Sequence, residues 1–137
     1  MRKIEAIIRP DRLHSVQEAL RDTGYPGLMV TEMMGHGRQR GGHEHWPANL
    51  REMFLPKVKL EIVVEEPCQE EVIACIAKAA RTGEMGDGKI FVYEVLDALR
   101  VRTGERGVIA VSPNQPPLPP PGRKTAKIGK AIGKKKR

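Results

Sequence analysis

The sequence of 137 residues is poor in aromatic side chains and has no long apolar run. Only 4% of the residues are aromatic, so a core must be built mainly from aliphatic side chains, for which the hydrophobic content of 39% is sufficient. No apolar run approaches the roughly 20 residues that span a bilayer. The first residues have neither the apolar length nor the cleavage site of a signal peptide. These absences predict a cytoplasmic protein with an aliphatic core.

Cysteine is scarce as well, since Cys68 and Cys75 are the only two. They stand seven positions apart on a predicted helix, and two helical turns rise about 10 Å. That separation is too long for a disulfide within one helix. We therefore expect both to act as small, buried apolar side chains.

Acidic side chains are absent from residues 113–137, which hold eight of the 24 lysines and arginines. Residues 1–112 carry the other 16 against 17 acidic residues, so this part is close to neutral. The proline-rich range 113–122 predicts an extended linker, and the basic range 123–137 predicts a disordered tail. The tail is either a solvated segment that aids solubility or an electrostatic attachment to a polyanion, such as an anionic membrane surface, an acidic partner or nucleic acid.

Within residues 1–112 the strand and helix patterns alternate. Strands are predicted at 3–9, 27–35, 57–66 and 89–99, and helices at 11–24 and 68–82. The order βαββαβ predicts an α+β fold of the ferredoxin-like type, a four-stranded sheet with both helices on one face. The opposite face is half apolar, because Ile7 and Val63 point there among charged side chains. Such a face favours burial against other subunits, so we expect an oligomer.

The connection 36–56 is long and contains no serine, threonine or tyrosine. A loop of this length inside a compact domain is usually functional or mobile. His43 and His45 flank Glu44 and can meet one metal ion if the loop is extended; the alternative is a solvated polar loop. Trp46 is the only tryptophan. It either anchors a partner protein or packs on its own subunit.

A glycine-rich segment at 82–89 places three glycines, Asp87 and Lys89 directly before the last strand. Glycines in this number need a positive φ or a close approach of the backbone to another group. The segment is either a tight helix-to-strand turn or a cradle of backbone N–H groups for an anion. Arg100 and Arg102 stand at period two and project together if their segment is extended, so with Lys89 they could hold a polyphosphate. The phosphate-loop and dinucleotide-binding motifs are absent.

Five stretches of the sequence resemble the PII family of nitrogen signal-transduction proteins. "TGEMGDGKIFV" is similar to the family's B-loop signature and "RVRTGERG" to the start of its C-loop. "KIEAIIRPDRL" resembles its first strand, while "VTEMMGHGRQRG" and "FLPKVKLEIVV" resemble the entry and exit of its T-loop. The resemblance covers residues 1–110 and implies a domain at 1–112 with a T-loop at 36–56, a B-loop at 82–89 and a C-loop at 100–108.

The resemblance implies a homotrimer that binds ATP or ADP in clefts between subunits. One side of the cleft is expected to consist of Ile7, Gly35, Gly37, Arg38, Gln39, Glu61 and Val63. The other side is expected to consist of Gly86, Asp87, Gly88, Lys89, Arg100 and Arg102, with the three cationic side chains on phosphates. The resemblance further implies a 2-oxoglutarate site that depends on Mg and ATP, in which Gln39 helps to hold the metal and Lys57 pairs with a carboxylate.

Two features depart from the family pattern. Met29 stands where the family often has a threonine, which alters the expected contacts to the base. The T-loop lacks the family's modified tyrosine, so it offers no hydroxyl for uridylylation, adenylylation or serine phosphorylation. The sequence thus predicts a non-enzymatic sensor of ATP, ADP and 2-oxoglutarate that contacts a target enzyme, transporter or regulator through the T-loop. The alternatives are a sensor of another small anion or metal, and a slow ATPase in the same cleft.

Overall fold

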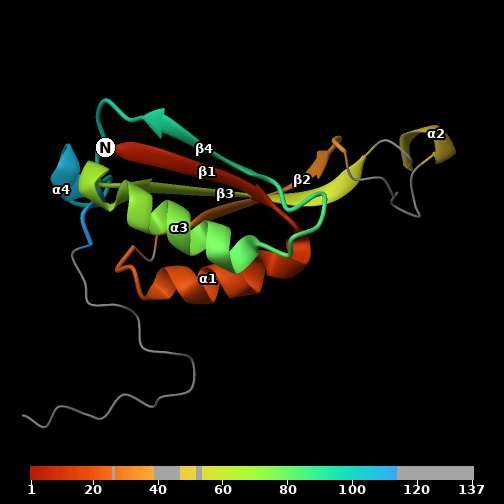
Figure 1. The fold of residues 1–137 in the computed structure, drawn as a ribbon. Helices are drawn as coiled ribbons and strands as arrows, with labels where there is room; N and C mark the ends of the chain where they lie inside the picture. The colour runs from red at the N-terminus through yellow and green to blue at the C-terminus, as the bar shows by residue number, and fades with distance from the viewer. Residues whose placement is uncertain (26, 39–46, 52–53, 114–137) are drawn as a thin grey trace, which may run out of the picture.

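The computed structural model describes residues 1–25, 27–38, 47–51 and 54–113. These residues form one antiparallel four-stranded sheet whose strands lie in the order β2-β3-β1-β4. Helices α1 and α3 both cover the same face of this sheet (Figure 1). The strands are β1 (Arg2–Ile8), β2 (Met29–Gly35), β3 (Leu55–Val64) and β4 (Lys89–Glu94), and the two long helices are α1 (Leu13–Arg21) and α3 (Gln69–Ala80). The βαββαβ order of the ferredoxin-like fold is confirmed.

Short helical segments complete the described chain. A 3-10 turn precedes each long helix, η1 (Pro10–Arg12) before α1 and η2 (Glu66–Cys68) before α3. Proline opens or follows the opening of each turn, which suits a position where no intrahelical N–H bond is needed. Two four-residue helices, α2 (Ala48–Arg51) and α4 (Val108–Val111), were not predicted. A single helical turn is too short to show a periodic pattern in the sequence.

Aliphatic side chains from both layers make up the core. On β1 the side chains of Ile4, Ala6 and Ile8 are buried, and each faces a buried partner on β3. Because side chains alternate across a strand, this register places the whole apolar set on the face covered by the helices. The prediction that the helices cover one apolar face of the sheet is therefore confirmed. The buried side chains are Ile4, Ala6, Ile8, Val16, Leu20, Tyr25, Val58, Leu60, Ile62, Val64, Val72, Ile76 and Ala80.

Both cysteines lie half-buried against this core and are unpaired. Burial raises the pKa of the Cys75 thiol, so it remains protonated at neutral pH. Tyr25 is almost fully buried, and its removal from water raises the pKa of its phenol to about 12. Both cysteines thus pack as small side chains against the core, as expected, but they are half-buried rather than buried.

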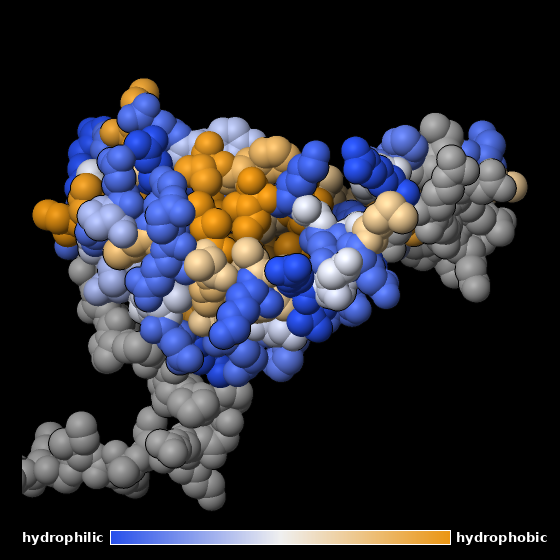
Figure 2. Space-filling view, in the orientation of Figure 1, coloured by the Kyte–Doolittle hydropathy of each residue, from blue (hydrophilic) through white to orange (hydrophobic). Residues whose placement is uncertain are grey.

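The helices leave the edge strand β4 partly uncovered. Val92 lies on the helix-side face opposite Ile4, yet Val92 is 40% exposed whereas Ile4 is 0% exposed. Figure 2 shows the resulting apolar area on this side of the molecule, framed by polar groups. On the opposite face, Phe91 and Tyr93 are exposed beside the charged residues of β1. Strand β4 therefore exposes apolar or aromatic side chains on both of its faces, as expected of a chain that packs against other subunits.

Charged side chains on the open face pair with one another. Lys3 Nζ lies 2.7 Å from Glu61 Oε1 and 3.4 Å from Glu5 Oε2, and it also lies 5.2 Å from the centre of the Tyr93 ring. The bond from Lys3 holds the pKa of the Glu61 carboxyl below its usual range.

Within the described ranges, no helix has the length and apolar character needed to cross a membrane.

The end of β4 was placed too far along the chain. It was expected to run to residue 99, but it ends at Glu94 because the chain folds back on itself. Gly107 N–H donates to the Ala98 carbonyl at 2.9 Å, and Leu99 pairs with Arg106 in an isolated antiparallel bridge. An aspartate also anchors this return, since Arg106 donates to the Asp97 carboxylate.

Candidate functional site

The backbone of the B-loop has the conformation that its glycines predict. Gly83, Gly86 and Gly88 have φ values of +91°, +100° and +99°. A β-carbon at Gly88 would lie 1.6 Å from the carbonyl oxygen of Ile7. The expected positive φ is confirmed for all three glycines, and a close approach to the backbone at the end of β1 is confirmed for Gly88.

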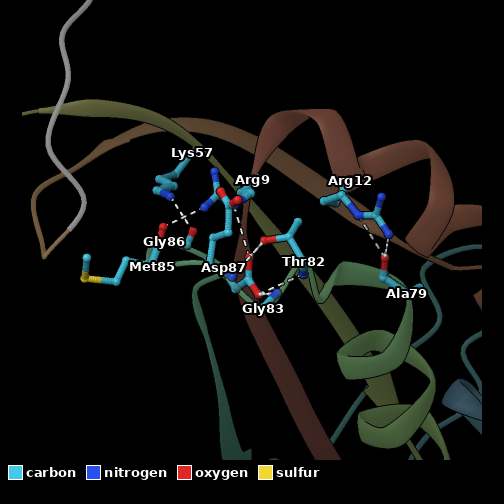
Figure 3. Close-up of polar contacts among 10 residues, drawn as sticks. Arg9, Arg12, Lys57, Ala79, Thr82, Gly83, Met85, Gly86 and Asp87 are labelled. Carbon is cyan, nitrogen blue, oxygen red and sulfur yellow. Dashed lines mark hydrogen bonds and ion pairs between the residues drawn. The ribbon is translucent and has the colours of Figure 1, made fainter.

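Asp87 holds this loop together from within. Its carboxylate accepts hydrogen bonds from the backbone N–H groups of Thr82 and Gly83, each at 2.8 Å, and from the Thr82 hydroxyl (Figure 3). The Thr82 hydroxyl, followed by the two N–H groups, holds the pKa of the Asp87 carboxyl well below its usual range. Asp87 is therefore ionised at neutral pH, and its side chain is directed at its own loop.

Two cations reach the B-loop from other elements. Arg9, at the end of β1, donates from Nε to Asp87 Oδ1 at 3.1 Å and from Nη2 to the Met85 carbonyl at 2.6 Å. Lys57, on β3, donates from Nζ to the Gly86 carbonyl at 2.6 Å. Partial burial, together with the nearby charge of Arg9, lowers the pKa of Lys57. Sequence reasoning assigned no role to Arg9; its position between a strand and Pro10 was the only available signal.

Ile7 and Lys89 lie side by side in the same chain. They are register partners on β1 and β4, and the B-loop lies at this end of the sheet because it leads directly into Lys89. Gly35 also lies at this end, where a β-carbon on it would be 3.1 Å from Lys57 Cγ. Beside the loop is a hollow of about 330 Å³. Its wall includes Ile7, Asp87, Gly88 and Lys89. We call this the T-loop end of the sheet.

Arg100 and Arg102 lie beyond the opposite end of β4. Glu94 pairs with Arg2 there, and Val95 N–H donates to the Met1 carbonyl at 3.1 Å. The C-loop therefore begins next to the N-terminus of the chain, at the end of the sheet away from the T-loop (Figure 1). Val63, the register partner of Lys3, is also near this end. We call this the N-terminal end of the sheet.

This arrangement corrects the expected grouping of the cleft residues. Ile7 and Gly35 were assigned to one side, and residues 86–89 to the other side together with Arg100 and Arg102. The structure instead gathers Ile7, Gly35 and 86–89 at the T-loop end of one chain. Antiparallel pairing is the reason, because it brings the end of β1 beside the start of β4.

The C-loop also differs from its expected conformation. Residues 101–103 form a turn closed by Gly104 N–H, which donates to the Arg100 carbonyl at 2.8 Å. The idea that Arg100 and Arg102 project together from an extended segment is therefore wrong. Arg100 bonds the Glu105 carboxylate and donates to the carbonyls of Ile109 and Ala110 at 3.1 and 3.2 Å. Arg102 is exposed.

The T-loop is described only at its base. Gly35 pairs with Leu55, and the rings of His36 and Phe54 lie 5.9 Å apart. Gly37 and Arg38 are exposed. Gln39, His43, His45 and Trp46 lie outside the described residues, so their predicted roles stay predictions. No cluster of three metal-ligating side chains occurs in the part of the chain that is described.

Met29 and Glu61 are register partners near the middle of the sheet. Met29 is 54% exposed at the β2 edge. Glu61 lies next to Val63 on the same face of β3, because alternate residues of a strand share a face. These three predicted contacts therefore line the open face rather than the B-loop.

Comparisons with known proteins cover most of this chain. A family model described as nitrogen regulatory protein P-II matches residues 1–105. The chain is 52% identical over 112 residues to the nitrogen regulatory protein P-II of Rhodospirillum rubrum and 46% identical to nitrogen regulatory protein P-II 1 of Escherichia coli. Each alignment covers 81% of this chain and all of the relative, so this chain is longer than either relative.

A solved structure is similar as well. The crystal structure of Arabidopsis thaliana PII bound to citrate matches with a TM-score of 0.67 at 44% sequence identity. The match covers 81% of this chain and 89% of that one. Sequence and fold thus point to the same group of proteins.

Proposed function

Because this chain belongs to the nitrogen regulatory protein P-II family, we propose that it is a homotrimer that binds ATP or ADP between subunits and signals nitrogen status. Members of this family are signal-transduction proteins that regulate nitrogen metabolism, and they are not enzymes. The observation that carries the nucleotide proposal is the B-loop. Its three positive-φ glycines and its internally bonded Asp87 shape a turn of backbone N–H groups next to Lys89.

The division of residues between the two ends of the sheet supports a shared cleft. Lys89 lies at the T-loop end, whereas Arg100 and Arg102 follow the N-terminal end of the same chain. A polyphosphate needs several cations at close quarters to offset its desolvation. We therefore infer that the T-loop end of one subunit meets the N-terminal end of the next, with Met29, Glu61 and Val63 toward the base.

The T-loop end also suits a dianionic small acid. Lys57 is a partly buried cation there, and burial of a second charged ligand next to a nucleotide requires such a counterion. Gln39 would contribute an amide oxygen to Mg, a hard cation that prefers oxygen ligands and binds nucleotide phosphates. Mg would supply the charge that lets 2-oxoglutarate and ATP bind together. We infer that 2-oxoglutarate binds only when both Mg and ATP are present.

Signal output is proposed to pass through the T-loop without covalent modification. The loop 36–56 contains no hydroxyl-bearing side chain, and Tyr25 is buried in the core. We infer that nucleotide and 2-oxoglutarate alone set the state of the loop. Target enzymes, transporters or regulators would then contact it, with Trp46 as an apolar anchor.

Calorimetry on a Lys89→Ala variant tests the cleft. Loss of a cation from a buried phosphate site costs roughly 2–5 kcal/mol, so the Kd for ATP should rise well beyond tenfold. Lys78→Ala is the matched control, because Lys78 is an exposed lysine on α3 that is not among the predicted cleft residues. If Lys89→Ala binds ATP within about threefold of the wild type, the assignment of the cleft is wrong.

A further inference from the structure

Arg9 is the side chain that ties the end of β1 to the inside of the B-loop. It is only 16% exposed and spans two different acceptors, the Asp87 carboxylate and the Met85 carbonyl (Figure 3). A planar guanidinium can serve two acceptors at once in a fixed geometry. Arg9 therefore constrains both the side chain and the backbone of the loop.

Arg9 and Lys57 engage two successive carbonyls. Arg9 bonds the Met85 carbonyl and Lys57 bonds the Gly86 carbonyl, both at 2.6 Å. In a trans peptide the C=O and the following N–H point in opposite directions. The N–H groups of Gly86 and Asp87 consequently point away from these two cations.

Successive N–H groups that point the same way form a concave anion site. The positive φ of Gly86 and Gly88 permits that arrangement, and Asp87 cannot disturb it because its carboxylate is bonded to Thr82, Gly83 and Arg9. Without Arg9, the Met85 peptide would be free to rotate and the Asp87 charge would lose its cationic partner.

We propose that Arg9 is a positioning residue for phosphate binding, which aims the N–H groups of Gly86 and Asp87 at the nucleotide without touching it. This inference rests on the proposed nucleotide site and adds a residue from outside the predicted set. It also explains why a cation stands directly before Pro10, where proline fixes the backbone and thus the direction of the side chain.

Arg12 provides a matched control. It comes from the same connection, and it donates from Nε and Nη2 to the Ala79 carbonyl at 3.1 and 2.8 Å, at the end of α3 (Figure 3). Arg12→Met removes one charge and two hydrogen bonds to a backbone carbonyl. It therefore shows the effect of losing an arginine that has only a structural role. Arg9→Met removes the same charge and the two bonds to the B-loop.

The experiment measures the Kd for ATP of both variants by calorimetry, at a temperature where thermal melting shows each protein to be folded. For Arg9→Met we expect a rise of about tenfold or more, the loss typical of one charge-assisted hydrogen bond. Arg12→Met should stay within twofold of the wild type. Arg9→Lys should recover only part of the affinity, because it restores the charge but not the planar group that serves both acceptors.

Amide spectra supply a readout that general destabilisation would not change. On saturation with ATP, the amide protons of Gly86 and Asp87 should shift in the wild type and in Arg12→Met, and should shift much less in Arg9→Met. If Arg9→Met does not fold, Arg9→Gln replaces it, since glutamine keeps a polar amide group but no charge.

Two results would overturn the inference: an Arg9 variant that binds ATP within twofold of the wild type, or an equal loss in Arg12→Met. These results are distinct from failure of the proposed function, in which Lys89→Ala itself would leave ATP binding unchanged. If Lys89→Ala binds ATP weakly while Arg9→Met binds it as the wild type does, the nucleotide site is retained and only the role of Arg9 is rejected.

Discussion

Two glycines of the B-loop share a backbone conformation but differ in their surroundings. Gly88 faces the backbone of Ile7, whereas nothing lies within 4 Å of a β-carbon placed on Gly83. Both have a positive φ, which costs an L residue roughly 1–2 kcal/mol. At Gly88 the clash with a strand backbone adds to that cost, and no flexible side chain is present to move aside. A comparison of the two positions thus separates the cost of a positive φ, which both share, from the cost of a clash with the backbone, which occurs only at Gly88.

We predict that Gly88→Ala lowers the Tm far more than Gly83→Ala does. Gly83→Ala should cost only the strain of its positive φ. Gly88→Ala should also push β4 away from β1 at Ile7 and weaken ATP binding. Thermal melting and ATP calorimetry on both variants check this. Equal Tm losses would show that β1 adjusts to the extra carbon.

Asp87 shows at the same scale how a residue can belong to a binding loop without contacting the ligand through its side chain. Its acceptors are used by Thr82, Gly83 and Arg9. The pKa of its carboxyl is lowered because these donors favour the charged form. Its contribution to the candidate site is the shape of the loop.

At the scale of elements, the β2–β3 hairpin links the T-loop to the B-loop. Gly35 and Leu55 pair at its base, and Lys57 follows two positions later with its bond to the Gly86 carbonyl. A ligand that pulls Lys57 toward a carboxylate would change this bond and the base of the T-loop together. This gives a short physical route from the proposed 2-oxoglutarate site to the loop that we propose to contact target proteins.

Incubation with a P-II uridylyltransferase and UTP should add no mass to this T-loop. The reaction needs an acceptor hydroxyl, and residues 36–56 contain none. Peptide mass spectrometry provides the measurement, with a relative that carries a loop tyrosine as the positive control. A uridylylated peptide from residues 37–56 would contradict the chemistry of the loop.

At the scale of the whole molecule, the chain carries a feature beyond the length of the relatives it matches. The eight basic residues of 123–137 lie outside the described residues, and they are the reason that the net charge is +7. Three copies in a trimer would bring roughly +24 to one assembly. We propose that these tails attach the trimer to a polyanion, with simple solubility as the alternative.

Removal of the tail should abolish binding to polyanions. The full chain and a chain that ends at Ser112 are compared by co-sedimentation with anionic liposomes and by gel shift with random DNA. Binding by the full chain should weaken steeply as salt rises, because released counterions drive it. If the shortened chain binds equally well, or neither binds at low salt, the tail has no such role.

The sequence by itself determined the order βαββαβ, most of the aliphatic core and the positive φ of the B-loop glycines. These depend on local rules, because side chains alternate with period two in a strand, recur near 3.6 in a helix, and glycine alone readily accepts a positive φ. Ile4, Val16, Ile62 and Val72, which lie within the predicted strands and helices, are therefore part of the core. The family resemblance, which is confirmed, rests on the same local stretches.

Only the tertiary structure decided which of the predicted residues lie together. Ile7 and Lys89 are 82 positions apart in the sequence, yet antiparallel pairing makes them neighbours, while Arg100 lies beyond the far end of β4. Arg9 likewise became part of the candidate site only through its tertiary contacts, since it donates to acceptors on Met85 and Asp87. Such contacts depend on strand register, and register is set by the packing of the whole sheet on its helices rather than by any short stretch of sequence.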